Sequence, residues 1–204
     1  MPIPKIPLGR GFWYDVYMKL TPLIYKAIHE AARLHNGQTR KIVELPFIVH
    51  PFSVGFILAQ YTDDEEVIAA GILHDTVEDV EGYTNEDVSR DFSERVARIV
   101  AGVTEPEHGT WREIRQIYLD GLRSGSDESV MVSVADKIHN ILSTIEGVEK
   151  FGVGIWEKFH ATPVDYLWYY EEVMAIAKER LDNPIVKEFE EVLNKAKETI
   201  FKEV

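Results

Sequence analysis

The stretch VIAAGILHDTVEDV, residues 67–80, combines helical periodicity with a cluster of ionisable side chains. Four of its residues recur at offsets of 0, 3, 4 and 7, and so share one face of a helix: Val67, Ala70, Gly71 and His74. Small side chains on this face let the backbone of another helix come close. The stretch therefore predicts a helix from Val67 to about Thr76 that carries a histidine on its packed face.

Acidic groups gather beside that histidine. Glu78 continues the same face at offset 11, and Asp75 with Asp79 forms an i, i+4 pair next to it. A similar apolar pattern recurs in SVMVSVADKIHN, residues 129–140, with Asp136 at offset 7. A carboxylate in that setting needs a cation, a charged partner or several hydrogen bonds to offset its lost hydration.

Helical periodicity extends through most of the chain. His50 precedes Pro51, and proline suits the first turn of a helix, so a helix is expected over 51–61 with His50 at its entrance. The remaining helices are expected over residues 20–34, from starts at Thr84, Ser93, Thr110 and Asp127, and as two helices within 163–202. Because no useful alternating pattern appears, the predicted fold is all-α, a single domain over 1–204 with the C-terminal helices packed on it.

Composition excludes several classes of function. The 204 residues carry a formal net charge of −13, which disfavours a nucleic-acid polymer as partner, because such binding needs a basic surface. The absence of cysteine excludes disulfides, thiolate nucleophiles and cysteine-based zinc sites. No run of about 18 apolar residues occurs, so no membrane association is predicted and a cytoplasmic location is expected. A small phosphorylated ligand stays possible if a metal ion supplies positive charge.

Four residues form a candidate metal site: His50, His74, Asp75 and Asp136. Together they are a mixed nitrogen and oxygen donor set suited to Mn, Fe, Zn or another divalent ion. Taken singly, each also has a structural interpretation, as a hydrogen-bonded histidine or an ion-paired carboxylate.

The order and local context of these residues resemble the HD-domain phosphohydrolases, named for their adjacent His-Asp pair. More narrowly, the chain resembles the hydrolase domain of the RelA/SpoT family and its stand-alone small alarmone hydrolases of the Mesh1 type. The resemblance rests on HNGQTRK, PFIVHP, ILHDTVEDV, DFSERVARIVAGVTE and VADKIHN, which follow one another within residues 35–144. It implies a bundle of helices around one divalent metal ion, usually manganese, held by His50, His74, Asp75 and Asp136.

The resemblance also implies roles for six further residues. Glu78 and Asp79 match the acid pair that positions or deprotonates water. Arg40 and Lys41 match a basic pair that contacts substrate phosphate or ribose. The resemblance also implies that Asn140 and Ser143 contact the nucleoside. Ser143 has a hydroxyl group where the family has threonine.

The implied activity is hydrolysis of the 3′-pyrophosphate of guanosine tetraphosphate or pentaphosphate, (p)ppGpp, to GDP or GTP and pyrophosphate. Two departures from the family leave the substrate open: the loop after Lys41 is one residue longer, and Leu142 stands in place of an arginine. The alternatives are an HD phosphohydrolase acting on another nucleotide, as a phosphomonoesterase or an NADPH-type phosphatase, and a non-catalytic nucleotide sensor. In each case the partner is a small phosphorylated nucleotide, and a homo-oligomer stays open.

Two basic residues on the expected helix after Thr110 are ambiguous. Arg112 and Arg115 are three positions apart, so they share a face that either contacts a phosphate or is solvated, and the solvated face is favoured. His35 and His139, which lie in or beside the matched motifs, are interpreted as supporting or structural groups rather than ligands.

Overall fold

The computed structural model describes residues 19–40 and 45–202. Apart from one isolated antiparallel bridge between Thr39 and Pro46, these residues form helices and loops without β-strands, so the all-α prediction is confirmed. The elements are α1 Pro22–Leu34, α2 Val49–Leu58, α3 Glu65–Leu73, α4 Thr76–Asp79, α5 Asn85–Asp91, α6 Glu94–Ala101, α7 Trp111–Ser124, α8 Asp127–Phe151, the 3-10 helix η1 Val153–Lys158, α9 Pro163–Arg180 and α10 Ile185–Thr199.

Helix starts follow the capping residues read from the sequence. Thr84, Ser93 and Thr110 each accept a hydrogen bond from a backbone N–H in the first turn of α5, α6 and α7. Asp127 is the first residue of α8, whose cap is Ser126. The expected break in the C-terminal region is also present, since Asn183 Oδ1 accepts from the Ile185 N–H where α10 begins.

Two predicted boundaries near the site are wrong. The helix expected to reach about Thr76 ends at Leu73, because side chains there satisfy the last carbonyls: His74 Nδ1 lies 2.9 Å from Gly71 O, and Thr76 Oγ1 donates to Leu73 O at 2.6 Å. His50 does not precede α2 but lies in its first turn, where Pro51 is tolerated because the first N–H groups of a helix have no intrahelical partner.

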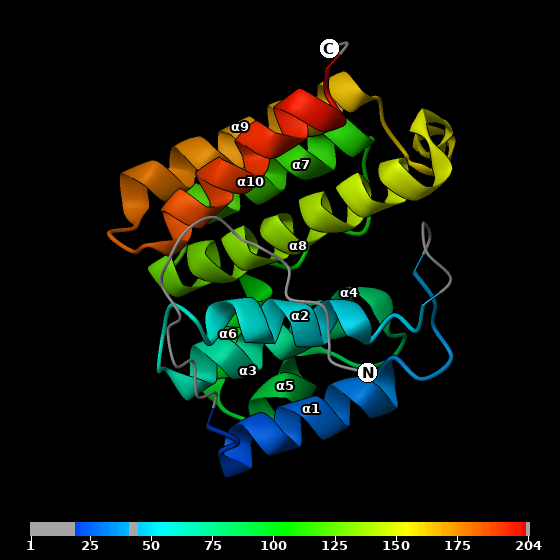
Figure 1. Ribbon diagram of the computed structural model, residues 1–204. Helices are drawn as coiled ribbons and strands as arrows, with labels where there is room; N and C mark the ends of the chain where they lie inside the picture. The colour runs from blue at the N-terminus through cyan, green and yellow to red at the C-terminus, as the bar shows by residue number, and fades with distance from the viewer. Residues whose placement is uncertain (1–18, 41–44, 203–204) are drawn as a thin grey trace, which may run out of the picture.

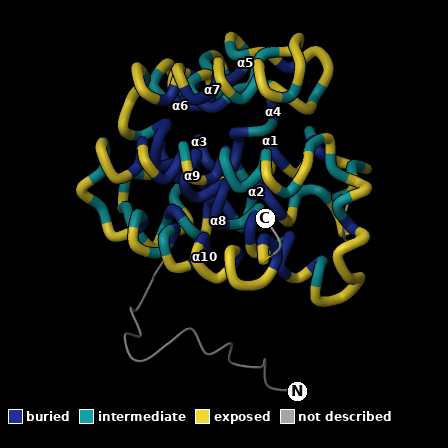
Figure 2. The backbone as a smooth tube through the Cα atoms, turned by 90° about the horizontal axis from the view of Figure 1, so that it is seen from above, coloured by how far each residue is buried: buried dark blue, intermediate teal, exposed yellow. Residues whose placement is uncertain are grey.

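The long helix α8 runs through the middle of the molecule (Figure 1). Helices α9 and α10 pack on one side of it, and α2, α3 and α6 pack on the other. Buried positions lie on the inward faces of these helices, with exposed positions around the periphery (Figure 2). Because α8 contacts both groups of helices, polar residues on it can meet polar residues from α2 and α3 inside the protein.

Close packing of α2 on α3 brings the two histidines together. A Cβ atom at Gly55 would lie 2.5 Å from Ile72 Cγ1, and one at Gly71 would lie 2.2 Å from Leu58 Cδ1. Such distances are far below van der Waals contact, so both glycines are needed for this helix approach. The expectation that small residues in α3 allow close approach is thus confirmed. None of the described helices is both long and apolar enough to cross a membrane.

Candidate metal centre and active site

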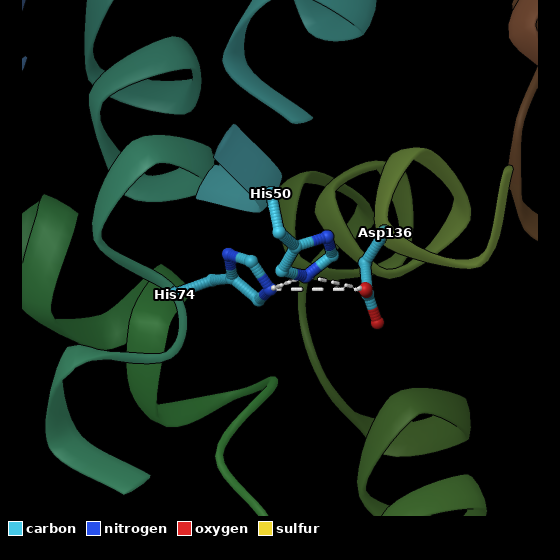
Figure 3. A group of neighbouring side chains, drawn as sticks. All are labelled: His50, His74 and Asp136. Atoms are coloured by element: carbon cyan, nitrogen blue, oxygen red, sulfur yellow. Dashed lines mark hydrogen bonds and ion pairs between the residues drawn. The ribbon is translucent and has the colours of Figure 1, made fainter. Parts of the chain in front are cut away.

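Three buried side chains from distant parts of the sequence converge at the centre of the molecule. His50 comes from α2, His74 from the end of α3 and Asp136 from the middle of α8, and they point toward one another (Figure 3). One ligand atom from each residue lies within 4.8 Å of the other two. His50 Nε2 is 3.2 Å from His74 Nε2 and 3.2 Å from Asp136 Oδ1.

Asp75 stands beside this group. Its Oδ1 lies 3.0 Å from His74 Nε2, and its Oδ2 lies 3.3 Å from His50 Nε2. The Asp75 side chain is partly open to the cavity, whereas Asp136 is buried. The break between α3 and α4 places Asp75 at the cap of α4 and so turns its carboxylate toward both imidazoles.

Neighbouring groups fix how the imidazoles face the cluster. His74 Nδ1 lies 2.9 Å from the Gly71 carbonyl, which can only accept, so Nδ1 carries the proton. In the neutral ring, His74 Nε2 then presents a lone pair to the cluster. His50 Nδ1 lies 2.7 Å from His139 Nδ1, and burial together with the nearby His50 and Arg40 lowers the pKa of His139 to about 3. His139 is therefore a neutral partner that orients His50.

This arrangement fits a divalent metal ion. Nitrogen and oxygen acceptors face one another in a buried space, and a cation placed among them would offset their mutual repulsion and lost hydration. Two imidazole nitrogens with one or two carboxylates suit several first-row divalent ions, so the geometry supports a metal site without selecting the metal.

A chain of polar contacts positions the Asp136 carboxylate. Lys137 forms an ion pair with Asp136 Oδ2, and Asn140, one turn later on α8, donates to Asp136 Oδ1 at 2.5 Å. Arg40 in turn donates to Asn140 Oδ1 at 3.1 Å. Asn140, which the family resemblance assigns to nucleoside contact, thus links the candidate metal ligand to the candidate substrate-binding arginine in this structure.

Glu78 and Asp79 lie on the short helix α4 at the edge of the same space. Both residues are exposed to solvent, although they also line the cavity, whose walls reduce their hydration. Burial and the carboxylate of Asp75 raise the pKa of Glu78 to about 7, and burial with the carboxylates of Asp75 and Glu78 raises the pKa of Asp79 to about 7. Carboxylates with such pKa values can exchange protons near neutral pH.

All of these groups open onto one cavity of about 620 Å³, which is large enough for a nucleotide. Its polar lining includes the predicted residues Arg40, His50, His74, Asp75, Glu78, Asp79, Asp136 and Asn140. Thr144, and not the predicted Ser143, lines the cavity, because Ser143 is turned one position around α8. Lys41 lies outside the described residues.

The cavity has further lining residues that the sequence did not single out for the site. Lys137, Tyr169 and Tyr170 contribute from α8 and α9, and Arg115 contributes from α7. The prediction that both arginines lie on a solvated helical face is therefore wrong for Arg115, whose side chain is mostly enclosed. It is right for Arg112, whose side chain is half exposed. Periodicity placed both arginines on one face, and only the packing of α7 against α9 separates them.

Comparison with known proteins points to one family. The family model of the HD domain matches residues 27–162. The chain is 36% identical over 141 residues to the putative GTP diphosphokinase RSH1, chloroplastic, of Oryza sativa subsp. japonica, which covers 60% of this chain but 16% of that relative. It is also 36% identical over 124 residues to the guanosine-3′,5′-bis(diphosphate) 3′-pyrophosphohydrolase MESH1 of Danio rerio, covering 59% of this chain and 68% of MESH1.

A solved structure of a metazoan ortholog of SpoT, described as hydrolysing ppGpp, has the same fold. It superposes with a TM-score of 0.70 at 24% identity and covers 86% of this chain and 96% of that chain. The order of motifs, the buried His-His-Asp cluster and the extent of these matches agree with one another. The chain spans about one sixth of the length of the first relatives that it matches, and it belongs to the HD-domain family, with homology to the hydrolase domains of RelA/SpoT proteins and to MESH1.

Proposed function

We propose that this protein hydrolyses the 3′-pyrophosphate of (p)ppGpp to give GDP or GTP and pyrophosphate. The observation that carries the proposal is the single cavity that joins the candidate metal cluster, two carboxylates with pKa values near 7 and the Arg40–Asn140 pair. The similarity to MESH1, whose name states this activity, supports the same substrate.

The metal site in this proposal uses His50, His74, Asp75 and Asp136, with manganese as the ion carried over from the family resemblance. When bound, a divalent ion lowers the pKa of coordinated water and polarises a phosphoryl group. The chain's own residues complete the surroundings: His139 and the Gly71 carbonyl orient the imidazoles, and Lys137 and Asn140 hold the Asp136 carboxylate.

In the proposed reaction, water attacks the phosphorus attached to the ribose 3′-oxygen. Glu78 accepts the proton from that water. Asp79, which lies at the same edge of the cavity, orients the water molecule. The bond between phosphorus and the 3′-oxygen breaks, and the 3′-oxygen takes up a proton as pyrophosphate departs. Arg40 offsets part of the substrate's negative charge, which the acidic protein would otherwise repel.

The test is turnover with separate detection of the two phosphorus products. Purified protein is incubated with MnCl₂ and ppGpp, and in parallel with nucleoside monophosphates and NADPH, and pyrophosphate and orthophosphate are assayed independently. Pyrophosphate together with GDP, absent from His74→Ala, is the expected result. Orthophosphate from another nucleotide, with no reaction of ppGpp, would replace this proposal by the phosphomonoesterase or NADPH-type alternative, and nucleotide binding without any turnover would favour a sensor.

A further inference from the structure

A partly buried ion pair lies next to Glu78 in the cavity wall. The backbone N–H of Glu105, in the loop between α6 and α7, donates to Glu78 Oε2 at 3.1 Å. The side chain of Glu105 forms an ion pair with Arg115 of α7, and the two side chains are only 17% and 16% exposed. Glu78, Glu105 and Arg115 thus form a continuous chain of contacts along the cavity wall.

Arg115 is itself held by two aromatic rings. The centre of its guanidinium lies 5.3 Å from the Trp111 ring centroid and 4.9 Å from the Tyr169 ring centroid, both within the range of cation–π attraction. Trp111 belongs to α7 and Tyr169 to α9, so the position of the guanidinium is fixed by two helices. A planar guanidinium with several donors suits this role better than a flexible ammonium group.

The loop that carries Glu105 needs such an anchor. Between the end of α6 at Ala101 and the start of α7 at Trp111, the backbone follows no helix or strand. The Glu105 amide therefore makes no helical hydrogen bond and depends on side-chain contacts to keep its position. A shift of about 1 Å in this amide would break the contact with Glu78, and misplacement on that scale costs roughly 100-fold in rate at an active site.

We propose that Arg115 is a positioning residue that acts through Glu105 on Glu78. Its ion pair holds the Glu105 amide in place, and that amide orients the carboxylate that accepts the proton from water. The inference rests on the catalytic role proposed for Glu78 and adds to it Arg115 of α7, which lies outside the matching motifs.

A direct contact of Arg115 with substrate phosphate is the competing role, since Arg115 lines the cavity. The Glu105 carboxylate already pairs with the guanidinium charge, so an incoming phosphate would have to compete with it, although Arg115 Nε and Nη1 have no hydrogen-bond partner among the described residues. The two roles differ in their kinetics. Loss of positioning lowers kcat with little change in KM, whereas loss of a phosphate contact made equally in the ground state raises KM.

The first experiment compares three variants in the full-length, metal-loaded protein. Arg115→Met is expected to lower kcat by about 10- to 100-fold with KM within twofold, and Arg115→Lys to recover part of that loss. Arg112→Met is the matched control, because Arg112 also stacks on an aromatic ring, at 3.1 Å from the Trp168 centroid, and pairs with Asp165 at 3.7 Å. Unlike that of Arg115, its side chain is 53% exposed and does not line the cavity. This variant should leave kcat and KM unchanged.

A double-mutant cycle then tests whether Arg115 acts through Glu78. In a Glu78→Gln background, Arg115→Met should produce no further loss of kcat, because the group that it positions is already inactive. The acidic limb of the pH–rate profile should move to higher pH in Arg115→Met alone, because Glu78 loses both a hydrogen bond and the nearby positive charge, which together favour its ionised form. Additive losses in the cycle, or a raised KM with unchanged kcat, would overturn the positioning role.

Wild-type turnover separates this inference from the proposed function. If the wild type releases pyrophosphate from ppGpp but Arg115→Met behaves like Arg112→Met, the positioning role alone fails. If ppGpp is not a substrate, the same cycle is run on whichever nucleotide is hydrolysed. If none is hydrolysed, a crystal structure of Arg115→Met decides: separation of Glu105 N from Glu78 Oε2 supports the inference, and an unchanged hydrogen bond refutes it.

Discussion

Arg40 and Asn140, one hundred positions apart in sequence, are joined by a 3.1 Å hydrogen bond from Arg40 Nη2 to Asn140 Oδ1. Asn140 also donates to Asp136, so the arginine at the cavity wall is connected to the candidate metal ligand through one side chain. Burial lowers the pKa of Arg40, but the guanidinium stays charged at any physiological pH because its ordinary pKa is so high. A partly buried guanidinium that lines a cavity is well placed to bind substrate phosphate.

Arg40→Ala should raise KM for ppGpp by roughly 10- to 100-fold, the loss expected when a hydrogen-bonded charge contact of about 1.5–3 kcal/mol is removed. Metal content should be unchanged, because Arg40 is not a candidate ligand and its side chain hydrogen-bonds to Asn140 rather than to the cluster. Steady-state kinetics and inductively coupled plasma mass spectrometry measure the two properties. An unchanged KM would remove Arg40 from the substrate site.

His74→Ala should abolish metal binding and reduce turnover to background. Metal that binds only the folded protein stabilises it, by about 2.7 kcal/mol at a concentration 100 times Kd, so adding EDTA should lower the Tm of the wild type by several degrees. In His74→Ala, EDTA should have no effect on Tm. His108→Ala, at a side chain that is 94% exposed and outside the cavity, is the control that should behave as wild type. Full metal occupancy in His74→Ala would contradict the site.

Glu78→Gln should lower kcat by about 10²- to 10⁴-fold while metal binding is retained. A general base works in its ionised form, and the pKa of Glu78 is raised to about 7 by burial and by Asp75. The wild-type rate should therefore rise with pH through about 7 and level off above it, because the protonated, inactive form dominates at lower pH. Glu78→Gln should lose this limb, whereas Asp79→Asn should keep it at a reduced rate. A pH profile that survives in Glu78→Gln would assign the base elsewhere.

Gly55→Ala should reduce the free energy of unfolding by about 1–3 kcal/mol, the usual cost of overpacking a core. The added methyl group would meet Ile72, a buried residue of α3, at 2.5 Å and force α2 and α3 apart. Because these helices carry His50 and His74, affinity for the metal should fall as well. Gly121→Ala, where a Cβ atom meets nothing within 4 Å, is the matched control. Urea denaturation and metal titration of both variants check the prediction.

Much of the fold could be predicted from local chemistry. Capping residues such as Thr84, Ser93 and Thr110 mark helix starts because their side chains satisfy the first free N–H groups, an interaction confined to a few residues of sequence. Apolar periodicity also depends only on residues close together in sequence, and it identified α1 and the two C-terminal helices. The end of α3 was misplaced because His74 and Thr76 hydrogen-bond to the backbone there, and helical periodicity carries no information about that competition.

The sequence by itself determined which groups are available for the site: two histidines, a set of carboxylates and an arginine in motifs typical of the HD-domain family. Only the tertiary structure decided which of them meet. The approach of α2 to α3 across two glycines brings His50 to His74, and the position of α8 between two groups of helices adds Asp136. Arg115 reaches the cavity wall and Arg112 does not, although both share one helical face, because contacts with α9 and the loop after α6 depend on packing between segments far apart in sequence.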